Sequence, residues 1–250
     1  MTMREEKMDY IISTKDITKT YHKRNVVDHL NINIKPGSIY ALIGQNGAGK
    51  TTFMKMLTGL ILPDAGNISL FGGAYSNRVS YMDGRKMGSL IENTGLMMNM
   101  TAYENIKAKC ICIGIKDETH IKNLLESVSL NQEKNKKVKN YSLGMKQRLG
   151  IALAMVGNPE LIILDEPING LDPQGIAFVR KLIKKLHENK ITIVISSHIL
   201  AEVEKIATTY GFINKGRLLE ELSLQELEEK CNSMGMTLEA YYLSLVGGSI

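Results

Sequence analysis

A glycine-rich segment, residues 44–52, carries the residue types best suited to chemistry, and it reads GQNGAGKTT. Glycines let successive backbone N–H groups turn toward one anion without clashes from Cβ atoms. A helix that begins at the end of the segment adds the positive end of its dipole. An apolar run precedes the segment and a helical stripe follows it, which favours a phosphate-binding loop over a plain turn. The expected nucleotide contacts are Gly44, Asn46, Gly47, Ala48, Gly49, Lys50, Thr51 and Thr52.

The loop predicts a site for a nucleoside triphosphate and Mg²⁺, and two carboxylates complete it. Lys50 can reach the outer phosphates, and the Thr51 hydroxyl can bind Mg²⁺. Asp165 and Glu166 follow the apolar run at residues 161–164. Two acids at the end of a buried strand are costly unless they face a cation or water, although a plain strand end is the simpler alternative. We expect Asp165 to bind Mg²⁺, directly or through water, and Glu166 to polarise the attacking water.

A third motif, YSLGMKQR, lies at residues 141–148, just upstream of the two acids. By itself it is an ordinary helix start with Ser142 as the N-cap. In order and spacing, however, the three motifs together resemble the ABC ATPase family, whose signature LSGGQ grips the γ-phosphate of ATP bound to the opposite subunit. Ser142 and Gly144 match that signature. Three positions depart from it: Tyr141, Leu143 and Met145.

The resemblance covers nearly the whole chain and implies roles for further residues. His198 follows a buried strand where the family has its switch histidine, so the implied catalytic set is Glu166, His198 and Lys50. Asp172 falls in the D-loop, which contacts the other subunit, and is expected at the nucleotide. Tyr21 stands where the family has an aromatic residue that stacks on adenine. Taken without the family, a lone histidine or a single aromatic is more often a packing residue.

One position departs from the family in an informative way. Residues 87–92 align with the Q-loop, where Glu92 replaces the usual glutamine. A carboxylate is a hard, charged ligand, so the expected metal ligands are Thr51, Asp165 and Glu92. Glu92, together with SLGM in the signature, resembles the subgroup of ABC exporters that protect bacteria from lantibiotics and bacitracin-like peptides. Three flexible thioethers follow it and predict either a docking surface for a permease helix or core filling: Met97, Met98 and Met100.

The pattern of apolar residues predicts the elements that position these motifs. Residues 30–35 alternate as a half-buried antiparallel strand does, and residues 39–43, 161–164 and 191–195 are buried parallel strands. Helical spacing covers residues 51–60 and the stripe from Ile176 to Leu186. We expect one α/β domain of the P-loop NTPase, ABC ATPase type over residues 1–250, with a mainly parallel sheet core and an antiparallel β subdomain. A helical subdomain is expected at about 93–157 and C-terminal helices at about 220–250.

Composition sets limits on compartment and partners. The formal net charge is +5, but the densest lysine cluster, at residues 134–139, has no interleaved aromatic residues, so no nucleic acid partner is expected. The three cysteines show no metal spacing and are expected to be reduced. No apolar run approaches the length of a membrane span, and residues 1–10 do not resemble a signal peptide. We expect a cytoplasmic chain, held at the inner face of the membrane by its permease.

The sequence therefore predicts an ATPase that binds ATP and Mg²⁺ as a head-to-tail homodimer or heterodimer and powers a separate membrane permease, with peptide export expected. One alternative is a soluble ABC ATPase that acts on nucleic acid or ribosomes. Such relatives carry two nucleotide domains or a long coiled-coil insertion, whereas residues 52–141 show no sustained heptads. A second alternative is an ATP-gated clamp without transport or hydrolysis, against which Glu166 argues.

Overall fold

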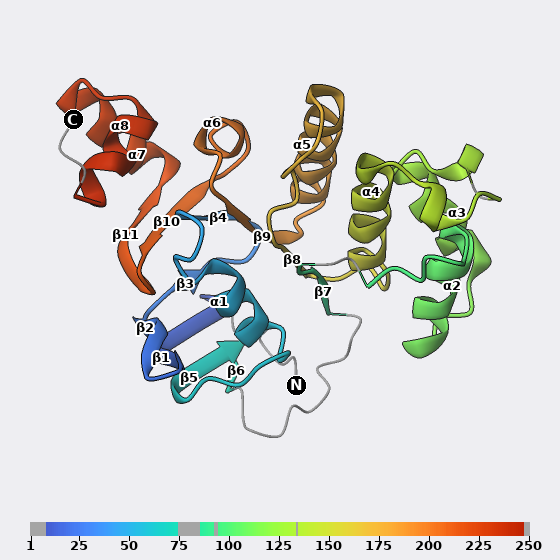
Figure 1. The fold of residues 1–250 in the computed structure, drawn as a ribbon, viewed down its shortest axis with the longest axis horizontal. Coiled ribbons are helices and arrows are strands. Elements are labelled where there is room, and N and C mark those ends of the chain that lie inside the picture. Colours follow the sequence, from blue (N-terminus) through green and yellow to red (C-terminus); the bar gives the residue numbers. More distant parts are fainter. Residues whose placement is uncertain (1–8, 75–85, 93–94, 134, 248–250) are drawn as a thin grey trace, which may run out of the picture.

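The computed structural model describes residues 9–74, 86–92, 95–133 and 135–247. Within these residues its centre is a six-stranded sheet in which only the edge strand β11 runs antiparallel to its neighbour (Figure 1). The spatial order is β11 (Arg217–Ser223), β10 (Thr209–Asn214), β4 (Ile39–Ile43), β9 (Thr192–Ser197), β8 (Leu161–Leu164) and β7 (Met87–Leu90). Every residue of β4, β8 and β9 is buried, as expected for parallel strands covered on both faces.

A second, antiparallel sheet lies beside the first one, at the lower left of Figure 1. Its strands are β1 (Ile12–Tyr21), β2 (Arg24–Leu30), β3 (Asn33–Ile34), β5 (Ala65–Leu70) and β6 (Gly73–Ala74). β1 pairs with β2, β3 and β5, and β5 pairs with β6. Both the mainly parallel core and the antiparallel sheet were expected from the sequence, so the predicted fold class is confirmed.

The prediction of one continuous strand at residues 30–35 is wrong, because these residues belong to two separate strands. Strand β2 ends at Leu30, one residue after His29, whose φ is 50°, and only Asn33 and Ile34 pair again as β3. Between the two strands the Asn31 side chain takes the place of a ladder partner. Its Oδ1 accepts the Asp16 N–H at 2.8 Å, and its Nδ2 donates to Asp16 Oδ1 at 3.0 Å. Alternation survives the break, since Leu30, Ile32 and Ile34 are all buried.

Helix α1 (Lys50–Leu57) follows β4 through the glycine-rich loop, and it is shorter than the sequence pattern predicted. Gly59 has a φ of 72° and ends the helix, which leaves Leu60 64% exposed rather than on the apolar stripe. The apolar stripe consists of Phe53, Met56 and Leu57. All three are fully buried, in the hydrophobic cluster that also contains the buried residues of the antiparallel sheet.

A group of helices occupies the right of Figure 1, between β7 and β8 in the sequence. It comprises α2 (Ala102–Cys112), α3 (Glu118–Ser127), η1 (Asn131–Glu133), η2 (Val138–Asn140) and α4 (Leu143–Ala154). A capping box of Thr101 and Glu104 opens α2, and Ser142 caps α4 as its sequence context indicated. The helices share one core with β8, β9 and α5.

Four more helices follow β8. They are α5 (Pro173–Glu188), α6 (Leu200–Val203), α7 (Leu224–Met234) and α8 (Leu238–Leu245). The last two begin at side-chain caps: a capping box of Ser223 and Glu226 precedes α7, and Thr237 caps α8. In Figure 1 these two helices stand at the upper left, at the far end of the molecule from α2 and α3.

The β10–β11 hairpin joins the two sheets at the base of the glycine-rich loop. The Gly216 N–H donates to the Ala48 carbonyl at 2.9 Å, and the Asp28 N–H donates to the Gly216 carbonyl at 2.9 Å. Arg217 Nε binds Asp28 Oδ2 at 2.6 Å. The hairpin therefore fixes the loop between both sheets. Among the described residues, no helix has both the length and the apolar character needed to cross a membrane.

Candidate functional site

Three neighbouring parallel strands end at the same edge of the central sheet and bring the predicted residues together. β4 leads into the glycine-rich loop, β8 leads into Asp165, and β9 leads into His198. β4 and β8 both pair with β9, so the three carboxyl ends lie side by side. In open α/β sheets this edge is where ligands bind.

The glycine-rich loop has no room for side chains at two of its glycines. A Cβ atom on Gly44 would lie 2.5 Å from the Ile213 carbonyl oxygen, and one on Gly49 would lie 2.5 Å from that of Val26. Gly49 also has a φ of 105°, in the region that favours glycine. α1 begins at the next residue, and no side chain caps its first turn. The loop and helix start therefore offer backbone N–H groups to an anion.

Lys50, Glu166 and His198 form a continuous polar chain. The Lys50 ammonium, 6% exposed, donates to the Gly44 carbonyl at 2.7 Å and lies 3.2 Å from Glu166 Oε1. Glu166 Oε2 lies 2.8 Å from His198 Nδ1. Glu166 itself has a φ of 47°, a conformation rare for a non-glycine residue and frequent at functional sites. A phosphate-binding cation, a carboxylate and an imidazole are thus held within one hydrogen-bonded unit.

Asp165 forms a second unit directly beside the first. Its Oδ2 accepts a hydrogen bond from the Thr51 hydroxyl at 2.7 Å, and its Oδ1 accepts one from Ser196 at 2.5 Å. Ser196 Oγ in turn accepts the Glu166 N–H at 2.8 Å. The Thr51 hydroxyl and Asp165 carboxylate are hard oxygen donors of the kind Mg²⁺ prefers. In the described part of the chain no group of three or more His, Cys, Asp or Glu side chains is arranged to hold a metal ion, so phosphates and waters would have to supply the other ligands.

Glu92, the third expected metal ligand, has a different partner in the structure. It follows β7 with a φ of 52°, and its carboxylate lies 2.7 Å from Lys55 Nζ. Lys55 is one helical turn after Thr51, so Glu92 lies near the unit of Thr51 and Asp165 without binding to it. Sequence reasoning did not identify Lys55, although a lysine at that helical spacing was a visible signal.

Ser142, Gly144 and Asp172 form a separate surface, away from the glycine-rich loop. Ser142 Oγ accepts the Met145 N–H at 3.2 Å and caps α4, and Asp172 Oδ1 accepts the Gly175 N–H at 3.0 Å and caps α5. The two helix starts line one hollow of about 480 Å³ together with Arg148 and Phe178. No residue of the 44–52 loop lines this hollow. The predicted contacts therefore fall on two surfaces of one chain.

Tyr21 ends β1 with its ring 43% exposed. The Lys19 ammonium lies 5.6 Å from the ring centroid, a cation–π contact that fixes the ring's position. An exposed ring face suits stacking, and burial in the core, the alternative for a single aromatic residue, is excluded.

A contact from the C-terminal helices to the loop was missed at the sequence level. The Gln45 N–H donates to the Tyr242 hydroxyl of α8 at 3.1 Å. The Tyr242 ring stacks on Phe212 of β10, with centroids 6.0 Å apart. Burial raises the pKa of Tyr242, so its hydroxyl stays neutral. No local motif marks a tyrosine that acts so far along the chain from its partner.

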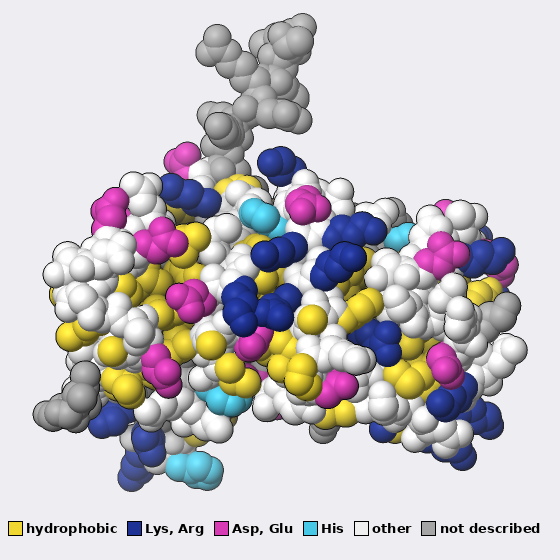
Figure 2. All heavy atoms as spheres, turned by 90° about the horizontal axis from the view of Figure 1, so that it is seen from above, with side chains coloured by type: hydrophobic (Ala, Val, Ile, Leu, Met, Phe, Trp, Pro, Cys, Tyr) yellow, Lys and Arg dark blue, Asp and Glu magenta, His cyan; other side chains and the backbone are white. Residues whose placement is uncertain are grey.

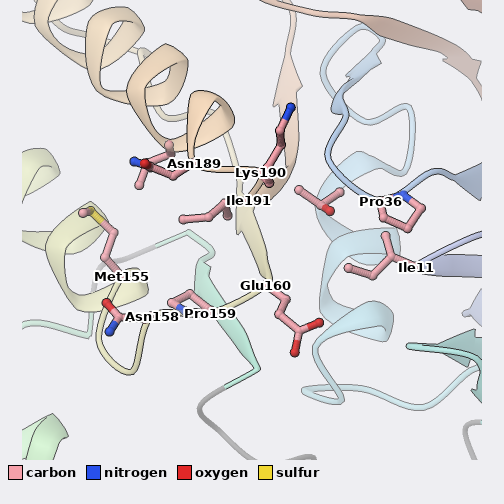
Figure 3. A pocket seen from close by; sticks show the side chains of 11 residues that line it. Ile11, Pro36, Met155, Asn158, Pro159, Glu160, Asn189, Lys190 and Ile191 are labelled. Atoms are coloured by element: carbon pink, nitrogen blue, oxygen red, sulfur yellow. The ribbon is translucent and has the colours of Figure 1, made fainter. Parts of the chain in front are cut away.

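Another hollow, of about 510 Å³, lies at the opposite, amino edge of the sheet (Figure 3). Ile11, Pro36, Met155, Glu160 and Ile191 are among the residues that line it. None of the residues predicted to bind nucleotide or metal is present there, so the chemistry belongs to the carboxyl edge.

Comparison with known proteins bears on this site. The sequence profile described as ABC transporter matches residues 27–169. The chain is 46% identical over 224 residues to the bacitracin transport ATP-binding protein BcrA of Enterococcus faecalis, covering 89% of this chain and 72% of BcrA. It is 44% identical over 226 residues to the lantibiotic transport ATP-binding protein SrtF of Streptococcus pyogenes, covering 89% of this chain and 96% of SrtF.

Solved structures of ABC transporter ATP-binding subunits have the same fold as this chain. One described as the ATP-binding subunit of an ABC transporter superposes with a TM-score of 0.82 at 27% identity, covering 94% of this chain and 99% of the other. A bacterial ABC transporter cassette, solved as a dimer, superposes with a TM-score of 0.78 at 25% identity, covering 85% and 98%.

Proposed function

The chain belongs to the ABC transporter family, and we propose that it drives export of a bacitracin- or lantibiotic-like peptide through a separate membrane permease. It is an ATP-binding subunit and ATPase of this family. The peptide cargo is supported by the names of relatives that are 44–49% identical over most of the chain. The observation that carries the catalytic part is the polar chain of Lys50, Glu166 and His198 beside the loop.

The loop binds the phosphates of ATP. Backbone N–H groups at the glycine-rich loop's junction with α1 and in the first turn of α1 face the anion, and the Lys50 ammonium stabilises the β and γ phosphates. Lys50 already points its ammonium at the loop, since it bonds to the Gly44 and Gln45 carbonyls at 2.7 and 3.2 Å. Tyr21 stacks on the adenine ring with its exposed face.

Glu166 and His198 act on the water. Water attacks the γ-phosphorus, the bond from that phosphorus to the bridging oxygen of ADP breaks, and the water proton passes to Glu166 or to the phosphate product. Glu166 accepts a hydrogen bond from the water, and His198 holds the carboxylate through the 2.8 Å contact at Oε2. Positioning of this kind does most of the work in phosphoryl transfer.

Thr51 and Asp165 fit a bound Mg²⁺. Their oxygens are already 2.7 Å apart, and Ser196 orients the other oxygen of Asp165. When bound, Mg²⁺ would neutralise charge that develops on the β and γ phosphates. Glu92 would join the metal only after release from Lys55, so we propose it as a ligand of the nucleotide-bound state.

Each site is completed by a second subunit. Ser142, Gly144 and Asp172 lie on a surface that shares no residue with the loop, so ATP on one chain meets these residues from another chain. Ser142 offers its hydroxyl and the start of α4 to the γ-phosphate. The partner is a second copy or a similar chain, and the whole chain acts as one ATPase domain.

The permease docks on exposed thioethers. Met97, Met98 and Met100 are 37%, 40% and 40% exposed, so core filling, the other interpretation of these methionines, is excluded. Flexible thioethers adapt to an irregular partner surface. They follow β7 and Glu92 in the sequence, and Glu92 contacts Lys55 of α1, so docking there would link permease movement to nucleotide state. The permease would hold the chain at the inner face of the membrane.

Light scattering on the Glu166→Gln variant tests the proposal. With ATP and Mg²⁺ we expect slowed hydrolysis, by about 100-fold or more, and a trapped dimer. Adding Ser142→Arg should return the chain to monomer, because the bulky cation blocks the helix start. Glu160→Gln, at the opposite edge of the sheet, is the matched control and should hydrolyse ATP normally. A Glu166→Gln chain that turns over ATP at the normal rate would refute the role of Glu166.

A further inference from the structure

A groove separate from the nucleotide site opens between α6, α7 and α8. Its volume is about 460 Å³, within the range of pockets that bind ligands or peptide side chains. Its floor is apolar and consists of Leu200, Tyr210, Leu224, Leu227 and Leu238. Tyr210, Leu227 and Leu238 are buried parts of the core, so the floor is a firm surface rather than a loose end.

Three exposed carboxylates form the rim of this groove: Glu204, Glu228 and Glu239. In the described part of the chain, none of the three carboxylates has an ion pair or a hydrogen bond. Nearby acids differ in this respect, since Glu220 pairs with Lys230 and Glu226 caps α7. Figure 2 shows the result as a yellow apolar patch edged by magenta acids on the left, over the C-terminal helices.

The rim charges act on the groove interior. Burial, reinforced by Glu204 and then Glu228, raises the pKa of Tyr210 to about 12. Burial, again reinforced by Glu204, raises the pKa of the Cys231 thiol. The contribution of Glu204 to both shifts is that of a nearby negative charge, and the same charge would attract a cation placed at the rim. An apolar floor with an acidic rim matches a helix that carries apolar residues on one face and Lys or Arg at its edges.

We propose that this groove binds a cationic amphipathic helix of a partner protein. Helix-in-groove recognition uses apolar anchors at helical spacing, and the floor residues provide the surface for them. The carboxylates then select basic flanking residues and exclude acidic helices.

The groove is connected to the nucleotide site by two elements. Leu200, in its floor, begins α6 two residues after His198. Leu238 and Glu239 begin α8, which also carries Tyr242, the residue whose hydroxyl accepts the Gln45 N–H of the loop at 3.1 Å. A helix seated in the groove would contact both elements, so its binding would change ATP turnover. This second step rests on the proposed ATPase function, whereas the binding step does not.

Two native cysteines allow the binding step to be located. Cys231 lines the groove and is partly exposed, while Cys112 lies on α2 and is exposed. The probe is a synthetic peptide of about 14 residues with Leu and Lys at helical spacing, and its control carries Glu in place of Lys. At saturating cationic peptide we expect maleimide labelling of Cys231 to slow about tenfold, as for a site covered by a helix, and that of Cys112 to stay unchanged.

The matched protein variant replaces the three rim carboxylates: Glu204→Gln, Glu228→Gln and Glu239→Gln together. All three side chains are exposed, so the fold should persist, which circular dichroism checks. We expect the affinity for the cationic peptide to fall about tenfold or more, as typical for lost charge pairs. Glu229→Gln, on the same helix but outside the groove, should leave the affinity within about twofold.

Several outcomes would overturn the proposal. One is that the cationic peptide slows maleimide labelling of Cys231 and Cys112 equally. Another is that the rim variant and the native chain bind the cationic peptide with equal affinity. A third is that the native chain binds the acidic control peptide as tightly as the cationic one. Protection of Cys231 by octylammonium at peptide concentrations would make this a small-cation site. Protection that rises with protein concentration alone would make it a contact between copies.

Turnover gives an independent readout. The bound peptide should change the KM for ATP about threefold or more in the native chain and not in the rim variant. If the cationic peptide protects Cys231 from maleimide but the native chain has no ATPase activity, the proposed function is refuted and the proposal that the groove binds a cationic helix stands. If the chain hydrolyses ATP and the peptide protects Cys231 but leaves the KM for ATP unchanged, the coupling between the groove and the nucleotide site is refuted.

Discussion

At the scale of single residues, Ser196 links the two acids of the site. It is fully buried, donates to Asp165 Oδ1 at 2.5 Å and accepts the Glu166 N–H at 2.8 Å. The same hydroxyl therefore orients the proposed metal ligand, Asp165, and fixes the backbone of the proposed catalytic base, Glu166. Glu166 needs such support because its φ of 47° is a strained conformation.

Replacement of Ser196 by alanine should reduce kcat about tenfold, with a smaller effect on the KM for ATP. The variant leaves a buried N–H and a carboxylate oxygen without partners, which costs about 1–3 kcal/mol of unfolding free energy. Steady-state kinetics and urea unfolding measure the two effects. Ser69→Ala, which removes an exposed hydroxyl bonded to the Gly73 carbonyl, serves as the control. A normal kcat with reduced stability would limit Ser196 to a structural role.

The sequence predicted best those site residues that belong to short contiguous motifs. Lys50, Thr51 and Asp165 were expected together because loop, strand end and metal chemistry require those types at those places. Tyr242 could not be found in this way, because its contact with Gln45 joins positions 197 residues apart. Glu92 shows the limit of resemblance, since its actual partner, Lys55, depends on local geometry.

At the scale of elements, α8 supports the glycine-rich loop. Tyr242→Phe keeps the ring stacked on Phe212 but removes the acceptor of the Gln45 N–H. One hydrogen bond is worth about 0.5–1.5 kcal/mol, so we expect the KM for ATP to rise about 2- to 10-fold with kcat nearly unchanged. Tyr241→Phe on the same helix removes a hydroxyl bonded to Glu220 and is the control. Equal effects of both variants would indicate a general loss of α8 docking.

The β10–β11 hairpin gives an element-scale prediction on pH. Hydrogen bonds from Arg217, His29 and Asn25 lower the pKa of Asp28 from 3.8 to about 2. A lowered folded-state pKa stabilises the native state above the unfolded pKa and loses this effect as pH falls through the folded one. The stability difference between the native chain and Asp28→Asn should therefore be constant above pH about 5 and shrink as the pH falls from there through about 2. Urea unfolding across that range measures it, and a difference that shrinks above pH 5 would contradict the assignment.

Element ends were harder to predict than element types. The stripe of α1 was correctly identified, but its extension to Leu60 was wrong because Gly59 adopts a left-handed conformation that ends the helix. The strand at residues 30–35 was interrupted for a related reason, since a side-chain exchange between Asn31 and Asp16 competes with ladder pairing. Periodicity records which face is buried, and local hydrogen bonding decides where an element stops.

At the scale of the whole molecule, the division of the site between two surfaces determines how the chain must work. The loop with Lys50 and the α4 start with Ser142 line different parts of one chain. Two copies related by a twofold axis can join each loop to the other copy's α4, which closes both sites at once. A monomer of this design would retain ATP and hydrolyse it slowly.

Mixing two inactive variants tests this arrangement. Lys50→Ala damages the loop and keeps the α4 start. Ser142→Ala does the reverse, because it removes the hydroxyl at the α4 start without the bulky cation that blocks dimer formation. In a homodimer with twofold symmetry, an equal mixture gives about half mixed dimers, each with one intact site and one doubly damaged site. If sites hydrolyse independently, activity should recover to about a quarter of the native rate, whereas each variant alone stays near background. A mixture of Lys50→Ala and Glu166→Gln, both on the loop-side surface, is the control and should not recover, because every site in it keeps a damaged loop-side half. Recovery in that control, or none in the first mixture at concentrations that form dimers, would contradict two independent sites shared between chains.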